Sequence, residues 1–360
     1  MQSVEQFRHD LLTWYSREKR DLPWRKTTNP YYIWISEIML QQTRVDTVIP
    51  YYERFIQKFP TVEHLAQSEE QDVLKLWEGL GYYSRARNLR IGAQQVVEHY
   101  QGVVPKTRKE ILTIKGIGPY TAGAILSIAY GLPEHAVDGN VMRVMSRLFY
   151  LTDDIAKPKS KKVFERAVMK TMSERDPSSF NQALMELGAV VCTPKNPTCL
   201  LCPVRSHCRA YDEGVQHQLP VKNQKTKVTE KIIVPFLLQN EKGEWLVRQR
   251  PSKGLLSNLW EFPYLEVEPT ETLRETKQKM SDSIGRSISI YATLPSYKHV
   301  FSHLIWHITP LYGRVDMFET DGIWVTEEQL QALPRPVPVL KAFESYEAEA
   351  PSIQMNEILL

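Results

Sequence analysis

The sequence contains little cysteine, and none of it is spread along the chain. Four cysteines occur in 360 residues, all between positions 192 and 208. A disulfide framework is therefore not expected, and the usage suits the cytoplasm, where thiols stay reduced. Long hydrophobic runs are missing too. None reaches the length of a membrane span, and the N-terminal MQSVEQFRHD has no apolar signal region.

An excess of charge of one sign is also absent. Lysine and arginine number 45 against 42 acidic residues, for a net charge of +3. Binding to nucleic acid would therefore depend on local basic patches. The run KPKSKKVFERAVMK (157–170) is one candidate, although a solvated helix face explains it equally well. The hydrophobic content of 42% suits a globular protein of one large or two ordinary domains.

The hydrophobic pattern changes character once along the chain. Up to residue 216 it has the helical period and shows no convincing strand. The polar, basic segment 217–231 is interpreted as a linker. The sequence thus predicts an all-α domain (1–216), an α+β domain (232–350) and a tail (351–360). Helices are expected at 3–18, 31–59, 61–77, 84–100 and 270–284, and strands at 232–238, 244–250, 287–293 and 304–313.

Residues 111–138 carry the first functional signal. An apolar turn at 111–114 leads into Lys115-Gly116-Ile117-Gly118, and an apolar helix is expected from Thr121 to Tyr130. Two glycines allow a tight bend and close approach of a ligand, and the N-terminus of the next helix favours an anion such as phosphate. Asp138 would lie beyond that helix, facing the hairpin. On this stretch alone, a purely structural helix–turn–helix capped at Gly118 is equally plausible.

The cysteines form a second motif, with the spacing Cys192-x6-Cys199-x2-Cys202-x5-Cys208. Four thiolates within 17 residues can close one tetrahedral site. Zinc and an iron–sulfur cluster are both chemically possible, and the spacing alone does not select one of them.

Together, the hairpin, Asp138 and this cysteine spacing resemble the endonuclease III class of helix-hairpin-helix DNA glycosylases over roughly residues 1–216. In that class the cysteines hold one [4Fe–4S] cluster. WISEIMLQQTRV (34–45) further resembles the MutY branch, the adenine DNA glycosylases, which remove adenine mispaired with 8-oxoguanine or guanine in duplex DNA. Nucleoid association in a prokaryote and a monomeric state are expected on the same basis.

This resemblance implies two catalytic carboxylates. Glu37 lies on an otherwise apolar helix, where desolvation would raise its pKa and make it a general acid for adenine N7. Asp138 would stabilise the oxocarbenium-like sugar and guide water, much as paired carboxylates do in glycoside hydrolysis. Tyr120 stands where bifunctional relatives carry a lysine nucleophile, so strand cleavage is not expected. Asn140 would orient groups in the site, or instead cap the helix expected near Val141.

Other residues receive roles from the same resemblance. Base removal from a duplex requires extrusion of the base. Adenine would be held by Trp24, Arg25, Leu40 and Gln182. The space that the extruded base leaves in the duplex would be filled by side chains of Gln41-Gln42-Thr43 and of Leu80-Gly81-Tyr82-Tyr83, with Tyr82 stacking between bases. The hairpin residues Lys115, Gly116 and Gly118 would contact the DNA backbone.

The second domain resembles the Nudix-related C-terminal part of the MutY branch. LLSNLWEFPYLEVE (255–268) is similar to the strand before the Nudix metal helix, but ETLRETKQKMSDSIG (271–285) lacks the paired glutamates, so nucleotide hydrolysis is not expected. The resemblance assigns this domain to 8-oxoguanine recognition, with Ser302 and His303 in the reading loop. Locally, a turn with two surface polar residues explains them equally well.

Two rival functions remain at this stage. One is a zinc-dependent DNA-binding protein without catalysis, in which Glu37 and Asp138 would be structural. The other is a bifunctional endonuclease III-like enzyme for oxidised pyrimidines, against which Tyr120 and the extra domain argue.

Overall fold

The chain forms two compact units that are not two consecutive stretches of sequence. The structure, a computed structural model, describes residues 3–223, 228–354 and 358. Unit 1 comprises residues 1–68 and 88–224, and unit 2 comprises residues 69–87 and 225–360. The expected linker 217–231 and tail 351–360 lie partly outside the described residues, at 224–227, 355–357 and 359–360. No helix in the described part is both long and apolar enough to cross a membrane.

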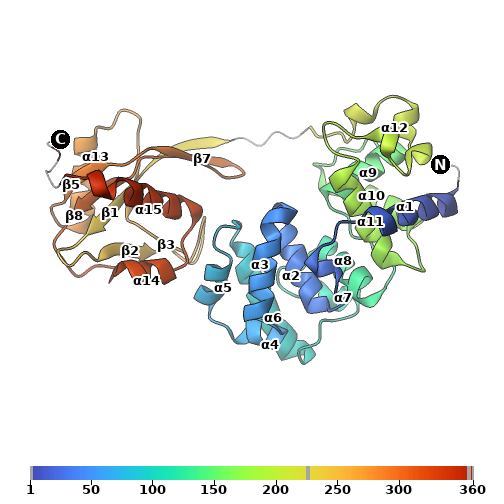
Figure 1. Cartoon of the computed structure of the whole chain (residues 1–360), viewed down its shortest axis with the longest axis horizontal. Coiled ribbons are helices and arrows are strands. Elements are labelled where there is room, and N and C mark those ends of the chain that lie inside the picture. The colour runs from blue at the N-terminus through green and yellow to red at the C-terminus, as the bar shows by residue number, and fades with distance from the viewer. Residues whose placement is uncertain (1–2, 224–227, 355–357, 359–360) are drawn as a thin grey trace. The chain divides into compact units, whose positions relative to one another are not determined.

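Unit 1 is helical throughout its described part, as the sequence predicts (Figure 1). Its α-helices are α1 (Val4–Glu18), α2 (Pro30–Leu40), α3 (Val45–Lys58), α4 (Val62–Gln67), α6 (Ser84–Tyr100, which begins in unit 2), α7 (Arg108–Ile111), α8 (Pro119–Tyr130), α9 (Gly139–Phe149), α10 (Lys161–Thr171), α11 (Pro177–Val190) and α12 (Arg209–Asp212). Short 3₁₀ segments are η1 (Pro23–Arg25), η2 (Pro158–Ser160), η3 (Cys199–Leu201), η4 (Arg205–His207) and η5 (Gln216–Gln218).

The centre of unit 1 is formed by α2, α8 and α11, which are apolar on most sides. Helix α8 packs against both α2 and α11, and α11 also packs against α1 and α9. Between α8 and α9 the chain runs tightly over α8, because a Cβ on Gly123 would lie 1.8 Å from the His135 carbonyl oxygen. Buried Asn181 of α11 fixes this crossing by donating to Ser127 Oγ and to the Glu134 carbonyl. The crossing therefore places Asp138 at the start of α9, beside α2 and α8.

Unit 2 contains a mixed nine-stranded sheet around one long strand. Strand β1 (Thr229–Gln239) pairs in parallel with β7 and β8, and antiparallel with β2 and β4. The other strands are β2 (Trp245–Gln249), β3 (Trp260–Glu261), β4 (Tyr264–Val267), β5 (Ser289–Thr293), β6 (Tyr297–Val300), β7 (Leu304–Ile308), β8 (Leu311–Arg314) and β9 (Ile323–Val325). The helices of this unit are α5 (Glu70–Leu76), α13 (Leu273–Ile284), α14 (Glu327–Ala332) and α15 (Val337–Glu349), with a 3₁₀ segment η6 (Ala350–Ser352).

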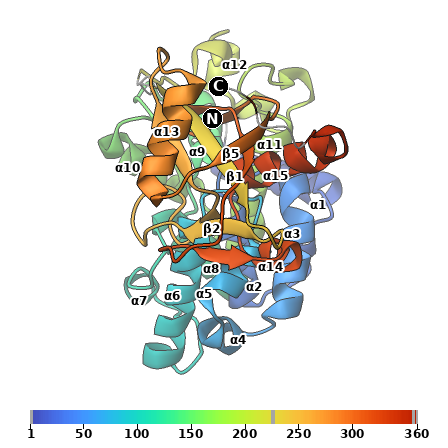
Figure 2. The same cartoon turned by 90° about the vertical axis from the view of Figure 1, so that its left-hand side faces the viewer.

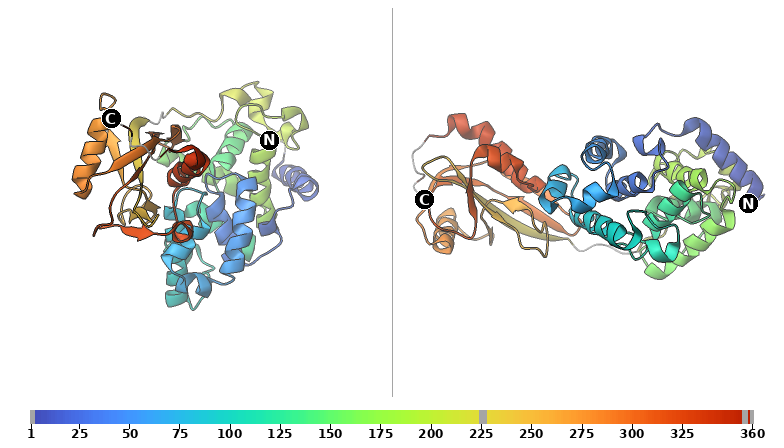
Figure 3. Two further views of the ribbon diagram at one scale, coloured as in Figure 1. Left: turned by 60° about the vertical axis from the view of Figure 1, so that its left-hand side comes forward. Right: turned by 90° about the horizontal axis from the view of Figure 1, so that it is seen from below.

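Helices cover both faces of this sheet. Orange α13 and red α15 lie on opposite sides of the strands in Figure 2 and in both panels of Figure 3. Side chains alternate along β1 accordingly. Phe236 and Leu238 pack in one apolar cluster with Met280 of α13, whereas Leu237 packs in another with Phe343 of α15.

The expected fold class is confirmed, with corrections to individual elements. The helix expected at 31–59 is two helices, because the chain turns between Leu40 and Val45 with Gln42 at a φ of 59°. The helix expected at 61–77 is likewise divided into α4 and α5. The strand expected at 304–313 is two strands, β7 and β8, separated by Thr309 and Pro310. The strand implied within 255–268 is two strands, β3 and β4, and strands β6 and β9 were not predicted.

Candidate active site

Most of the predicted site residues of the helical part line one pocket in unit 1. The pocket has a volume of about 870 Å³ and lies among α2, α8, α9 and α11. The predicted residues in its wall are Trp24, Arg25, Glu37, Leu40, Gln41, Gln42, Thr43, Gly116, Gly118, Tyr120, Asp138, Asn140 and Gln182. Trp24 and Gln182, which are 158 positions apart in sequence, thus meet around a single cavity.

Glu37 occupies a site with unusual electrostatics. It lies in the last turn of α2 and is only 5% exposed. Burial raises the pKa of its carboxyl to about 7, and the charge of Asp138 adds to the rise, while a hydrogen bond from Tyr120 and the charge of Arg25 oppose it. A carboxyl of this pKa is half protonated near neutral pH, as a general acid requires.

Tyr120 determines how Glu37 presents its proton. Its hydroxyl donates to Glu37 Oε2 at 2.6 Å. Burial, reinforced by the nearby carboxylates, keeps the pKa of Tyr120 well above its usual range, so the phenol remains a donor. Because Oε2 accepts this hydrogen bond, the acidic proton of neutral Glu37 is carried by Oε1.

Asp138 is held as the N-cap of α9. Its Oδ1 accepts from the Val141 backbone N–H at 2.7 Å, and its Oδ2 accepts from Asn140 Nδ2 at 3.0 Å. Burial raises the pKa of Asp138, although these hydrogen bonds and the charge of Arg143 oppose the rise. Fixing both oxygens in this way orients the carboxylate towards the pocket it lines.

The proposal that Asn140 caps α9 is wrong, because Asp138 does so. Asn140 lies inside the first turn, where it donates to Asp138 and accepts from Arg143 Nη2 at 2.9 Å. Arg143 also donates to the carbonyls of Gly188 and Cys192. A continuous chain of hydrogen bonds therefore connects the catalytic candidate Asp138 with the cysteine segment.

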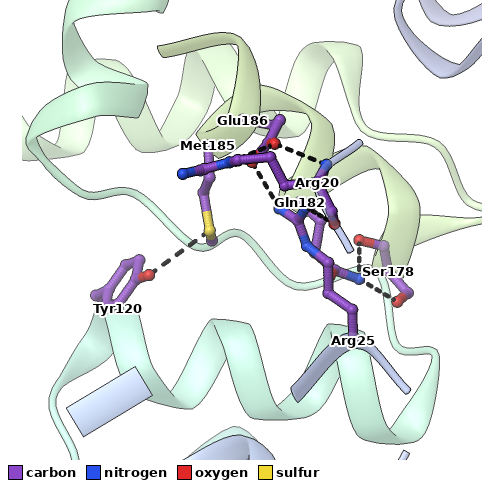
Figure 4. A network of polar contacts seen from close by, with 7 residues as sticks. All are labelled: Arg20, Arg25, Tyr120, Ser178, Gln182, Met185 and Glu186. Atoms are coloured by element: carbon purple, nitrogen blue, oxygen red, sulfur yellow. Dashed lines mark hydrogen bonds and ion pairs between the residues drawn. The ribbon is translucent and has the colours of Figure 1, made fainter. Parts of the chain in front are cut away.

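Sequence reasoning missed Glu186, the group that holds Arg25. Figure 4 shows Glu186 of α11 between two arginines. Arg20 donates from Nε at 2.8 Å and Arg25 from Nη2 at 2.7 Å. Burial alone would raise the pKa of Glu186, but these partners lower it to about 2, so it remains ionised. The signal was available in ALMELGAV, where a carboxylate interrupts an apolar helix as Glu37 does.

Cysteines 192, 199, 202 and 208 line a second, apolar pocket in unit 1. Burial raises the pKa of Cys202 to about 12 and that of Cys208 to about 11, so a bound cation is needed to convert these thiols to thiolates. Arg147 of α9 donates to Cys192 Sγ at 3.2 Å and to the carbonyls of Thr193 and Pro194. In the part of the chain that the structure describes, no group of three or more His, Cys, Asp or Glu is placed to hold a single metal ion.

Unit 2 brings together two predicted mispair-reading residues. Tyr82 is 45% exposed, and its hydroxyl lies 2.8 Å from Ser302 Oγ. Ser302 and exposed His303 form the turn between β6 and β7. Leu80, by contrast, is buried, and exposed Lys115 of unit 1 does not line the first pocket. The contact between Tyr82 and Ser302 thus joins residues 220 positions apart in sequence.

Helix α13 does not present paired carboxylates. Its Glu275 accepts from Thr272 in a capping box, and Glu271 before it accepts from Lys279. Both acids therefore serve local structure.

Two family models match separate parts of the chain. Residues 35–173 match the HhH-GPD superfamily of base excision DNA repair proteins, and residues 234–345 match the NUDIX domain. The first match includes Glu37, Tyr120 and Asp138, and together the two matches include the Tyr82–Ser302 pair. The pocket residues before position 35, those of α11 and the cysteine segment lie outside both matches.

Known proteins resemble the chain over nearly all of its length. The adenine DNA glycosylase of Homo sapiens is 34% identical over 98% of this chain and 76% of its own. That of Buchnera aphidicola subsp. Baizongia pistaciae is 35% identical over 93% of this chain and 95% of its own. Among solved structures, a thermostable thymine-DNA glycosylase is 31% identical, with a TM-score of 0.54 over 58% of this chain and 97% of that one.

Proposed function

Because the chain belongs to the adenine DNA glycosylases of the HhH-GPD superfamily, we propose that it hydrolyses the N-glycosidic bond of adenine opposite 8-oxoguanine or guanine in duplex DNA. It would act on duplex DNA as a monomer, and in a prokaryote in association with the nucleoid. The base would be extruded into the 870 Å³ pocket of unit 1.

The observation that carries this proposal is the buried Glu37 carboxyl with a pKa of about 7. As the adenine leaves, negative charge develops on the base. A proton from Glu37 Oε1 to adenine N7 neutralises that charge, so that a neutral base departs. General acid catalysis of this kind contributes about 10²–10⁴-fold to the rate.

Asp138 would act on the sugar. Departure of the base leaves positive charge at C1′ and the ring oxygen, which the ionised carboxylate stabilises electrostatically. Asn140 and the Val141 N–H hold Asp138 in one orientation while it directs water to C1′. One protonated and one ionised carboxyl in the same pocket match the division of roles in glycoside hydrolysis.

The reaction would stop at base removal. The phenol of Tyr120 cannot form a Schiff base with C1′, and its hydroxyl is engaged with Glu37. Lys161 is the lysine that lines the described pocket, so it provides the control. Borohydride should trap no DNA adduct with the wild type. An adduct that Lys161→Gln abolishes would identify a lysine nucleophile and contradict a purely hydrolytic enzyme.

Discrimination of the opposite base would reside in unit 2. The pair Tyr82–Ser302 places a stackable ring next to a hydroxyl on an exposed turn with His303. 8-Oxoguanine differs from guanine at N7–H and O8, so a hydroxyl can distinguish them by one hydrogen bond. A good contact of this kind gives about 1–3 kcal/mol of discrimination.

A [4Fe–4S] cluster would be held by Cys192, Cys199, Cys202 and Cys208. All four cysteines line one apolar pocket, so their sulfurs are placed to share a single group. Their x6-x2-x5 spacing is that of the cluster ligands in the endonuclease III class. The cluster would fix the loop that carries Lys195 and Arg205, so that these cations can contact phosphates. Its visible absorbance near 400 nm distinguishes it from zinc.

The decisive experiment is alkali-induced strand scission on duplexes with adenine opposite 8-oxoguanine, guanine or thymine. Scission is expected for the first two only, and only after alkali. Glu37→Gln, which keeps the shape but has no acidic proton, should lose at least ~10²-fold in single-turnover rate while still binding the duplex. Tight binding without any base removal by the wild type would instead indicate the non-catalytic DNA-binding protein.

A further inference from the structure

The cations that line the pocket fall into two classes. Arg20 and Arg25 are both engaged in ion pairs with Glu186, at 2.8 and 2.7 Å, which fix the positions of their guanidinium groups. Arg44 and Lys161 line the same pocket, yet within the described residues neither side chain forms an ion pair or a hydrogen bond. Two cations thus remain available to a ligand.

These two cations approach the pocket from different elements. Arg44 is the exposed N-cap residue of α3, directly after Gln41-Gln42-Thr43. Lys161 is the first residue of α10 and is half-buried. Helices α3 and α10 are well separated in both Figure 1 and Figure 2. A ligand seated in the pocket therefore meets unpaired cations that come from two separate helices.

The chemistry of an extruded nucleotide fits this arrangement. Its base enters the pocket, but its sugar stays connected to two backbone phosphates, one on each side. Those phosphates approach the buried, ionised carboxylate of Asp138, whose charge repels them unless cations intervene. Arg20 and Arg25 cannot serve, because Glu186 already holds them.

We propose that Arg44 and Lys161 each bind one of the two phosphates that flank the extruded deoxyadenosine. This inference rests on the function proposed above and adds two DNA-positioning residues to it. The pair holds the nucleotide from both sides, so that C1′ stays between the acid and the carboxylate that stabilises the sugar. In the basic run 157–170, Lys161 is the residue in the pocket wall, whereas Lys162 is exposed and outside it.

The test measures binding and needs no cleavage. A 2′-fluorinated deoxyadenosine opposite guanine resists glycosidic cleavage, because the fluorine disfavours positive charge at C1′. For each phosphate that the protein no longer neutralises, the slope of log K against log[salt] should become less steep by about 0.9. Lys161→Gln and Arg44→Gln should each show this change on the fluorinated duplex and none on a fully paired duplex. The charge-preserving Lys161→Arg and Arg44→Lys should keep the wild-type slope.

Two controls distinguish binding of the two flanking phosphates from general electrostatic attraction between the protein and DNA. Lys162→Gln, next to Lys161, and Lys58→Gln, at the end of α3, should affect both duplexes alike. A neutral methylphosphonate in place of one flanking phosphate should give the wild type the same change of slope as one of the two glutamine variants. When that variant binds the same modified duplex, its slope should not change further.

Unchanged slopes in both glutamine variants, or equal losses on the two duplexes, would overturn the proposal. The proposal would also be overturned if the change of slope caused by each glutamine variant added to the change caused by each of the two methylphosphonates. Failure of the wild type to remove adenine would contradict the proposed function instead, and the binding slopes do not depend on that result.

Discussion

At the scale of single residues, two buried glutamates line one pocket with pKa values displaced in opposite directions. Burial favours the neutral form of both. Glu186 receives charged hydrogen bonds from two arginines, which lower its pKa to about 2, whereas Glu37 receives one neutral hydrogen bond and its pKa rises to about 7. The same residue type is thus a permanent anion in α11 and an acid that is half protonated near neutral pH in α2.

The raised pKa of Glu37 has a cost in stability that depends on pH. The native state binds the proton more tightly than the unfolded state, so the contribution is favourable below pH ~4.5 and is lost as pH rises through about 7. Glu37→Gln does not titrate. At pH 8 it should therefore be more stable than the wild type by about 3 kcal/mol, and the gain should shrink towards zero near pH 4.5. Urea unfolding across this range measures the difference, and a gain that is independent of pH would contradict it.

Tyr120→Phe tests the donor to Glu37. The hydrogen bond from Tyr120 lowers the pKa of Glu37, so its loss should raise that pKa further. Glu37 would then stay protonated to higher pH, and the alkaline limb of kcat/KM should move up by about one pH unit. Single-turnover rates between pH 6 and 9 record this limb. A limb that stays in place would mean that another group controls it.

Sequence alone could single out Glu37, because a carboxylate on an otherwise apolar helix is costly to bury unless it is protonated or paired. It could not locate the partners of that carboxylate. Tyr120 is 83 positions away, and Glu186 lies 161 positions from Arg25. The direction of each pKa is decided by these contacts, so the roles of the two acids depended on the fold.

At the scale of elements, the close packing of α11 against α9 sets the position of Asp138. A Cβ on Gly188 would lie 2.8 Å from Asn140 Cβ and 3.3 Å from the Asn140 carbonyl oxygen. Gly188→Ala must therefore displace the first turn of α9, and a shift near 1 Å can reduce the rate by about 10²-fold. Rapid-quench rates measure catalysis and duplex affinity measures binding. We expect kcat to fall more than the affinity for the duplex.

Gly313→Ala is the matched control for crowding elsewhere. Its Cβ would meet the Ser289 carbonyl oxygen at 2.5 Å, in the sheet of unit 2. This variant should lose stability without a comparable loss of base removal from A opposite G. Equal catalytic losses in both variants would show that general destabilisation, and not the displacement of Asn140, lowers the rate.

The hydrophobic period predicted helix and strand types well, but it could not show where elements break. The four polar residues Gln41–Arg44 stand between two apolar stretches and are no longer than the polar intervals found within helices, so the period did not mark the break that the left-handed Gln42 makes. Similarly, β3 and β9 are two and three residues long, too short for an alternating pattern to be recognised. Their partner is β2, which is distant in sequence from β9.

At the scale of the whole molecule, unit 2 should supply lesion preference but not base removal. A chain truncated after residue 223 should still remove adenine opposite guanine and lose its preference for 8-oxoguanine. Amide exchange at Val73 and Leu74 should accelerate, because neighbouring Gln71 and Lys75 bond to residues 258 and 333. An unchanged preference would reject this role for unit 2.

A point substitution in unit 2 tests the same role without relying on correct folding of the truncated chain. Ser302→Ala removes the hydroxyl that faces Tyr82 and leaves the sheet intact. It should repeat part of the loss of preference, by up to about 1–3 kcal/mol of discrimination between the two opposite bases.

The division of unit 2 into residues 69–87 and 225–360 affects how the protein is made. The first piece leaves the ribosome 137 residues ahead of the second, since residues 88–224 come between them. At ~5–20 residues per second, the segment 69–87 waits roughly 7–27 s for the residues of unit 2 that hydrogen-bond to Gln71, Lys75 and Tyr82. During synthesis this segment therefore depends on a chaperone or on unit 1 for protection, and slow translation beyond residue 224 would lengthen its exposure.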